Sequence, residues 1–263
     1  MQLLKRVLVI AALFYLPLQS QAWSLTGHRV VGGIAESYLT PKARKAITAL
    51  LGNESLAMVA NWPDFVKSDP AYNYLSNWHY INFEDGFSFQ AMHDFLEKDT
   101  SVNAYTKVNF MVKELKKGNL SRETKIMYVK LIVHIIGDLH QPMHVGRLSD
   151  LGGNRVKVMW FNEATNLHAV WDDKLVDFQQ LSYTEYINAI NFTTAEQRKA
   201  WQSDSFDKWI YDSYAISRKL YEEIKQPDQK LSYRYNFDHI KTVNEQLLKG
   251  GVRLAGVLNG IFG

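Results

Sequence analysis

The chain has 263 residues, 46% of them hydrophobic, with a formal net charge of +3 and no cysteine. The lack of cysteine excludes disulfide bonds and thiolate zinc sites, so the core, bound metal or both must stabilise the fold. With so small a net charge, the chain also lacks the strong positive field that is typical of proteins that bind duplex DNA.

The first 22 residues have the pattern of an export signal. Lys5 and Arg6 precede an apolar run, 7–18, and the following Gln19-Ser20-Gln21-Ala22 suits signal peptidase. The run is about twelve residues long, shorter than the ~20 that span a bilayer. We therefore expect residues 1–22 to be a signal peptide and residues 23–263 to form one domain that is secreted or periplasmic and has no membrane anchor.

Apolar residues recur at helical spacing in several stretches bounded by helix start and stop signals. Thr40 and Pro41 suit an N-cap and a first turn, and Gly52 suits the end of that helix. Further helices are expected at about 126–139, where Pro142 follows the end, at about 207–224 and at about 237–258. We predict an all-α fold with a single compact helical domain.

One segment departs from the helical pattern. Val156, Val158 and Trp160 alternate with polar or flexible neighbours, and residues 162–166 supply turn residues. This pattern predicts a short strand or a minor β-hairpin from about Asn154 onward.

Polar residues interrupt the apolar helix expected at 126–139. His134 and Asp138 are four residues apart, so both side chains project from one face about one turn apart. Imidazole nitrogen and carboxylate oxygen are ligands that zinc accepts. His144 follows Pro142, where the helix must have ended, so it can turn back toward the same cavity.

Further groups of this kind lie along the chain. His168 and Asp172 repeat the four-residue spacing, and Asp64 and His79 lie upstream. Cleavage after Ala22 would also free the α-amino group of Trp23, five residues before His28, and a neutral amine can bind zinc.

A single His/Asp pair is more often a helix hydrogen bond than a metal site, but the set together predicts metal. Of the eight histidines, we expect His140 to pack at a helix end, and His93 and His239 to be ordinary, partly exposed residues.

The ordered set of these elements resembles the zinc-dependent single-strand nuclease family of the S1/P1 type, which is related in fold and metal site to zinc phospholipase C. The matching elements span the chain after residue 22, and none is specific alone. They are Trp23 with His28, Trp62-Pro63-Asp64, Trp78-His79-Tyr80-Ile81-Asn82, the segment from His134 to His144, Gly152-Gly153-Asn154 and the segment from Leu167 to Asp172.

The resemblance implies a cleft with three Zn²⁺ ions. One would be held by Asp64, His79, His134 and Asp138, a second by Trp23, His28 and the bridging Asp138, and a third by His144, His168 and Asp172. It also implies that Asn154 helps to bind the scissile phosphate, with Asp64, Asp138 and Asn154 as the catalytic residues. Tyr80 and Asn82 stand where the family holds a nucleobase.

The implied function is a secreted zinc-dependent endonuclease that hydrolyses single-stranded DNA and RNA to 5′-phosphate products, with 3′-nucleotidase activity left open. We expect a monomer. The sequence offers no nucleophile elbow and no phosphate-binding glycine loop, which agrees with attack by water. Two alternatives stay open: a zinc phospholipase C, and a secreted zinc-binding protein without catalysis, although the His-rich tracts of such proteins are absent.

Overall fold

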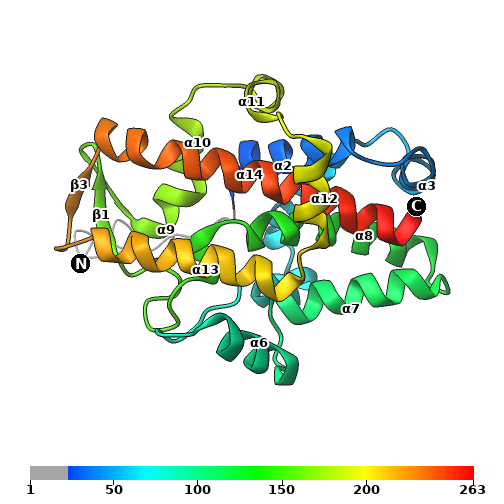
Figure 1. Ribbon diagram of the computed structural model, residues 1–263, viewed down its shortest axis with the longest axis horizontal. Helices are drawn as coiled ribbons and strands as arrows, with labels where there is room; N and C mark the ends of the chain where they lie inside the picture. The colour runs from blue at the N-terminus through cyan, green and yellow to red at the C-terminus, as the bar shows by residue number, and fades with distance from the viewer. Residues whose placement is uncertain (1–22) are drawn as a thin grey trace, which may run out of the picture.

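The computed structural model describes residues 23–263. The predicted signal peptide, residues 1–22, lies outside this range. Most of the described chain is helical (Figure 1). The α-helices are α2 (Leu25–Ser37), α3 (Pro41–Leu51), α4 (Leu56–Val59), α5 (Trp62–Phe65), α6 (Phe89–Lys98), α7 (Ala104–Lys117), α8 (Arg122–Leu139), α9 (Leu167–Ala169), α10 (Leu175–Asp177), α11 (Tyr183–Ile190), α12 (Ala195–Ser203), α13 (Phe206–Glu223) and α14 (Tyr233–Phe262). Three 3₁₀ helices, η1 (Val66–Ser68), η2 (Pro70–Trp78) and η3 (Pro142–Val145), and a π-helical turn, η4 (Val170–Lys174), join them.

The predicted helices are present, and their ends follow the local signals. Thr40 caps α3 by accepting a hydrogen bond from the Ala43 amide, and Gly52 follows its last residue with a positive φ of 68°. Ser121 caps α8 in the same way through the Thr124 amide. The prediction of an all-α domain is confirmed, and no helix among residues 23–263 is long and apolar enough to cross a membrane.

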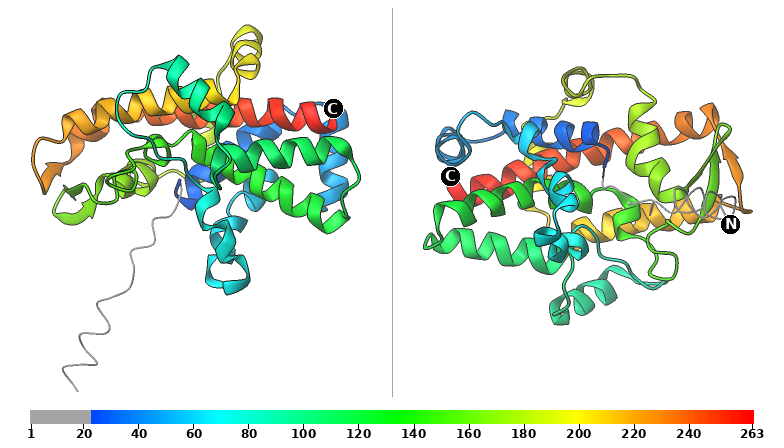
Figure 2. Two further views of the ribbon diagram at one scale, coloured as in Figure 1. Left: turned by 90° about the horizontal axis from the view of Figure 1, so that it is seen from below. Right: turned by 180° about the vertical axis from the view of Figure 1, so that it is seen from behind.

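Helix α8 lies in the centre of the molecule. Its second half is buried, including the fully enclosed Ile132, Val133 and Ile136. Helix α14 runs the length of the molecule, the shorter α13 runs in the opposite direction, and β3 (Gln229–Leu231) lies in the connection between them at one end (Figures 1 and 2). Helix α14 packs closely on α2 because Gly251 has no side chain: a Cβ there would lie 2.5 Å from the Ile34 Cβ.

The β-structure is larger than the predicted hairpin. Strand β1 (Lys157–Trp160) pairs antiparallel with β2 (Glu163–Asn166) and parallel with β3. The prediction that residues 162–166 form the turn was wrong, because residues 163–166 are the second strand. The reversal occurs instead at Phe161 and Asn162, where Phe161 takes a left-handed φ of 55°. Figure 1 shows this sheet at the end of the molecule opposite α3 and α7.

Candidate metal centre

Asp138 lies at the centre of a buried cluster, near the C-terminal end of α8. Its Oδ2 is 3.1 Å from His79 Nδ1 and 3.2 Å from His134 Nε2. Its Oδ1 is 3.4 Å from His28 Nε2, and the Asp138 side chain is fully buried. One carboxylate therefore faces three imidazole rings at once, as the proposed bridging role requires.

The entry into α2 brings the first described residues to this cluster. Trp23 is fully buried, and its indole Nε1 donates to the Gly137 carbonyl at 2.9 Å. The His28 ring stacks on the His134 ring with centroids 3.9 Å apart. A Cβ at Gly137 would lie 3.0 Å from His28 Nδ1, so a glycine at this position of α8 leaves room for the ring.

Asp64 joins the cluster from α5. Asp64 Oδ1 lies 3.7 Å from His134 Nε2, and donor atoms of His28, Asp64 and His134 fall within 4.8 Å of one another. His79, His134 and Asp138 form a second group by the same measure. The structure thus brings together the five side chains predicted for the first two ions, and it groups His28 with Asp64 and His134 as well as with Asp138. The ligand role of the Trp23 amine stays a prediction.

A third group lies beside these two. His144, in η3, and His168, in α9, both face Asp172: His144 Nε2 is 3.4 Å from its Oδ1 and His168 Nε2 is 2.9 Å from its Oδ2. The chain does turn back after Pro142, as predicted. Gln141 is fully buried here, and its amide nitrogen donates to Asp172 Oδ1 while its oxygen accepts from the Met143 amide.

Backbone carbonyls orient three of the rings. His134 Nδ1 lies 2.7 Å from the Ala60 oxygen, and His144 Nδ1 lies 2.7 Å from the His79 oxygen. His168 Nδ1 lies 2.6 Å from the Gly152 oxygen. A carbonyl can only accept, so each Nδ1 carries a proton and each Nε2 is turned toward the cluster, which is the usual arrangement of a metal-binding histidine.

The charges of the cluster favour a cation between the carboxylates. Burial alone would raise the pKa of Asp64, but His134 and Lys67 lower it to about 2. Burial would lower the pKa of His144, but Asp138 and Asp172 raise it to about 9. Buried carboxylates that draw protons onto a buried imidazole need positive charge nearby, and a divalent ion supplies it.

The donor atoms fit zinc. A set of buried nitrogen and oxygen atoms in the cluster has no hydrogen-bond partner, an uncommon condition for buried polar groups. They are both ring nitrogens of His28, Asp64 Oδ2, Nε2 of His79, His144 and His168, Asp138 Oδ1 and Asp172 Oδ2. Imidazole and carboxylate without thiolate form a common zinc ligand set, so the residues present suit the predicted metal.

A cavity of about 460 Å³ opens onto this centre. His79, His144 and His168 line it together with the predicted substrate residues Tyr80, Asn82 and Asn154. The Tyr80 side chain is exposed and donates its hydroxyl to Asn77 at 3.0 Å, which holds the ring at the rim. The Asn82 Oδ1 is buried without a partner, and it can therefore accept a hydrogen bond from a ligand.

Sequence reasoning missed Lys67. Its Nζ lies 2.5 Å from Asp64 Oδ1, and its side chain lines the same cavity. The signal was present in the sequence, since Lys67 follows Asp64 by three residues and a helical turn places such neighbours side by side. An ammonium group at the border of the cavity can pair with a phosphate oxygen.

The turn before β1 depends on glycine. Gly152 has a φ of 63°, and a Cβ there would lie 2.4 Å from the Met143 oxygen and 3.0 Å from Asn82 Oδ1. Its carbonyl is the one that accepts from His168. The same turn presents Asn154 to the cavity, so one tight reversal positions groups for both metal and substrate.

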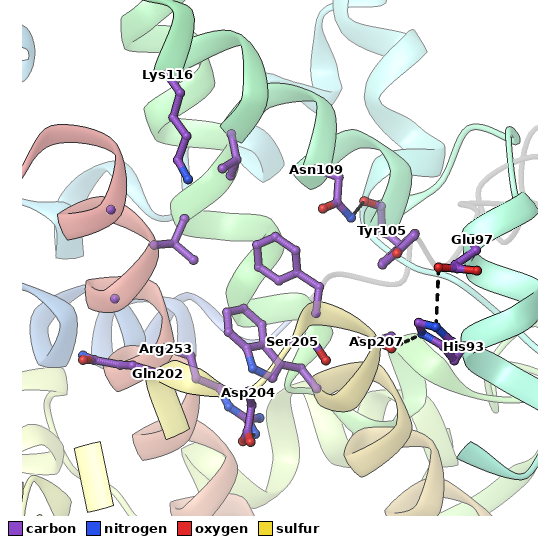
Figure 3. Close-up of a pocket in the computed structure, with 16 residues that line it drawn as sticks. His93, Glu97, Tyr105, Asn109, Lys116, Gln202, Asp204, Ser205, Asp207 and Arg253 are labelled. Atoms are coloured by element: carbon purple, nitrogen blue, oxygen red, sulfur yellow. Dashed lines mark hydrogen bonds and ion pairs between the residues drawn. The ribbon is translucent and has the colours of Figure 1, made fainter. Parts of the chain in front are cut away.

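The remaining histidines lie outside the centre. His140 packs at the end of α8 as expected, with Nδ1 on the Ile136 oxygen and Nε2 accepting from Arg253 Nη1 at 3.0 Å. His239 was wrongly expected to be partly exposed: it is buried, and its Nε2 contacts Glu223 Oε2 at 2.8 Å. His93 is partly exposed and lines a separate cavity of about 520 Å³ that contains none of the predicted site residues (Figure 3).

A mainly helical fold with three adjoining His/Asp groups that could each hold a metal ion defines a candidate metal-binding protein, and comparison with known proteins gives the family. A sequence model of the S1/P1 nucleases matches residues 23–263. The chain belongs to the S1/P1 nuclease family and is a hydrolytic nuclease that acts on nucleic acid.

Individual relatives agree with this assignment. The chain is 29% identical to Endonuclease 3 of Arabidopsis thaliana, over 91% of this chain and 89% of the relative. It is 27% identical to Nuclease P1 of Penicillium citrinum, over 92% and 98% of the two chains. Nuclease S1 of Aspergillus oryzae is 31% identical over 64% of this chain and 59% of the relative.

Among solved structures, the alpha toxin from Clostridium absonum is similar with a TM-score of 0.48 and 18% identity, over 92% of this chain and 67% of the toxin.

Proposed function

We propose that the chain is an exported, zinc-dependent endonuclease that hydrolyses single-stranded DNA and RNA to 5′-phosphate products. The main support for this proposal is that three His/Asp groups adjoin a cavity lined by Tyr80, Asn82 and Asn154. Many donor atoms of these groups have no hydrogen-bond partner. A protein that only binds zinc needs the donor atoms but no adjoining substrate cavity. The adjoining cavity with groups for a base and a phosphate favours catalysis.

Three ions are proposed, with the ligands divided as the family resemblance implies. Asp64, His79, His134 and Asp138 would hold one, and Trp23, His28 and Asp138 a second. His144, His168 and Asp172 would hold the third. Bound zinc supplies Lewis acidity to the phosphoryl oxygens and lowers the pKa of water toward about 7, so the chain needs no side-chain nucleophile.

The residues of the chain bind and orient the substrate. The Asn154 carboxamide and the Lys67 ammonium group can hold oxygens of the scissile phosphate at the border of the cavity. The exposed Tyr80 ring offers a stacking surface worth about 1–3 kcal/mol per base, and Asn82 can accept a hydrogen bond from that base. A base must leave its stack to reach Tyr80, which favours single strands over a duplex. None of these contacts requires a 2′-hydroxyl, so DNA and RNA should both be cleaved.

The test combines zinc content with turnover. The mature protein is incubated with single-stranded DNA, duplex DNA, RNA, a 3′-nucleotide and phosphatidylcholine, each with and without a chelator, and bound zinc is measured by mass spectrometry. We expect chelator-sensitive cleavage of both single strands with 5′-phosphate ends. Asp138→Asn should lose zinc and activity, whereas His93→Gln, a histidine of the separate cavity, should retain both.

The outcomes separate the alternatives. Turnover of phosphatidylcholine without cleavage of nucleic acid would replace the nuclease proposal with a phospholipase C. Bound zinc without any turnover would indicate a zinc-binding protein. Cleavage that survives complete removal of zinc would refute the role given to the metal.

A further inference from the structure

The cavity of about 460 Å³ at the candidate metal centre is here called the metal cavity. Another cavity, here called the second cavity, adjoins it. It has a volume of about 560 Å³ and lies between the start of β1 and the loop after α13. Arg155 lines both cavities, so the two lie next to each other at this side chain. The other charged residues that line the second cavity are Lys157, Lys225 and Asp228.

The register of the sheet extends this connection. Asn166 of β2 lines the metal cavity and pairs directly with Lys157 of β1. Met159, two residues further on, pairs with Lys230 of β3. Directly paired side chains lie on the same face of a sheet, and alternate residues of one strand share that face. Lys157 and Lys230 therefore lie on the face that begins at the metal cavity, and both are exposed.

These cations have no acidic partner. No carboxylate lies within 4 Å of the charged groups of Arg155, Lys157, Lys225 or Lys230 among residues 23–263. Nearby Lys174, by contrast, is neutralised by Glu163 at 3.0 Å. The one acid of the second cavity, Asp228, contacts this segment through its backbone, where its amide donates to the Lys157 oxygen.

We propose that Arg155, Lys157, Lys225 and Lys230, here called the basic track, bind successive phosphates of a nucleic acid strand that continues beyond the metal cavity. The inference rests on the proposed function and deepens it, because it predicts a substrate longer than the nucleotides in the cavity. The four cations are exposed, are not neutralised by acids, and lie beside the proposed site of phosphodiester cleavage. A polyanion such as a nucleic acid strand is the partner that suits them. The overall charge of the chain hides this feature, since the cations are gathered at one end of the molecule.

The test uses Lys157→Gln/Lys225→Gln/Lys230→Gln, which removes three exposed charges outside the metal cavity. The matched control, Lys45→Gln/Lys113→Gln/Lys116→Gln, removes three exposed charges on α3 and α7, at the opposite end of the molecule (Figure 1). Each protein is assayed on a dinucleotide and on an oligonucleotide of about 20 nucleotides at increasing salt. All are produced from the full 263-residue chain.

We expect the track variant to cleave the dinucleotide like the wild-type protein but to lose about tenfold in kcat/KM on the oligonucleotide at low salt. The slope of log kcat/KM against log salt should decrease by about 2, since each single-strand phosphate contact contributes about 0.7. The control variant should match the wild type on both substrates.

Equal losses in the two variants, or an unchanged salt slope in the track variant, would overturn the basic track and leave the nuclease proposal intact. A loss on the dinucleotide as large as on the oligonucleotide would also overturn it. Failure of the wild-type protein to cleave either substrate would refute the proposed function and the track with it.

Discussion

At the scale of residues, the metal centre depends on groups that carry no metal-binding signature of their own. His134 is oriented by the carbonyl of Ala60, which lies 74 residues away in the chain, and His168 by that of Gly152, 16 residues away. Every backbone unit has a carbonyl, so the sequence could predict the ligands but not which carbonyls would hold them.

Gln141 should act through Asp172. Its amide donates to one Asp172 oxygen, so Gln141→Ala should lower the affinity for the ion proposed at His144, His168 and Asp172 by about 10–100-fold, as loss of such supporting contacts commonly does. Titration with a competing chelator measures the affinity. Gln90→Ala, an exposed glutamine of α6, is the control. Unchanged zinc affinity in Gln141→Ala would show that Asp172 is held by other contacts.

Gly152 should not tolerate a side chain. Gly152→Ala would force a Cβ against the Met143 oxygen in a left-handed conformation, and we expect a loss of about 1–3 kcal/mol in the free energy of unfolding. Denaturant unfolding measures the change. Gly260→Ala is the matched control, because nothing lies within 4 Å of its Cβ position in α14 and alanine favours a helix by about 0.5–1 kcal/mol. Equal stability of the two variants would contradict this reading of the turn.

At the scale of elements, long helices were predictable because each shows its apolar period and its caps over many residues. Helices α8, α13 and α14 were expected from such patterns, although α14 begins four residues earlier and ends four residues later than the predicted 237–258. Strand β3 has three residues and pairs with β1 about 70 positions away. So short a segment shows no period, and a distant parallel pairing leaves no local trace.

The contact between α6 and α13 should depend on pH. His93 Nδ1 lies 2.6 Å from Asp207 Oδ2 and its Nε2 lies 3.5 Å from Glu97 Oε1 (Figure 3). The hydrogen bond to Asp207 raises the pKa of His93 above its ordinary value of 6.5, against a smaller effect of desolvation, with Glu97, Asp207 and Asp94 adding to the increase. Protonated His93 therefore stabilises the fold below about pH 6.5, and this stabilisation is lost as the pH rises through the higher folded-state pKa.

The measurement compares His93→Gln with the wild type. The difference in Tm between the two proteins should be largest near pH 6 and should shrink toward about pH 9, where His93 is neutral. His239→Gln, a histidine variant outside the α6–α13 contact, is the control. A Tm difference that is constant with pH would contradict the role of the charge.

At the scale of the whole molecule, the chain has no disulfide and concentrates many of its polar donor atoms in one buried centre. Removal of metal would leave Asp138 and Asp172 buried with only protonated imidazole, such as that of His144, to compensate their charge. We expect a chelator to lower Tm by about 8–16 °C, since saturation of one site at about 1,000 times its Kd contributes about 4 kcal/mol. Calorimetry before and after dialysis, with zinc restored at the end, measures this change. An unaltered Tm would show that the core alone stabilises the fold.

The position of Trp23 makes the proposed cleavage site testable. If the Trp23 amine is a ligand, two residues added before it should remove one zinc ion and most of the activity. The same two residues added after Gly263, at the far end of α14, should change neither. Full activity and full zinc content in the N-terminally extended protein would refute the assignment of Trp23.

The packing of Trp23 has a further consequence for the lifetime of the enzyme. Its side chain has no exposed surface, and the next amide, that of Ser24, donates to the Asp172 carbonyl at 2.7 Å. Exopeptidases must draw a free, extended end into their own active sites. In a mature chain that starts at Trp23, the first residue would be buried from the outset, so the enzyme should resist trimming from its N-terminal end.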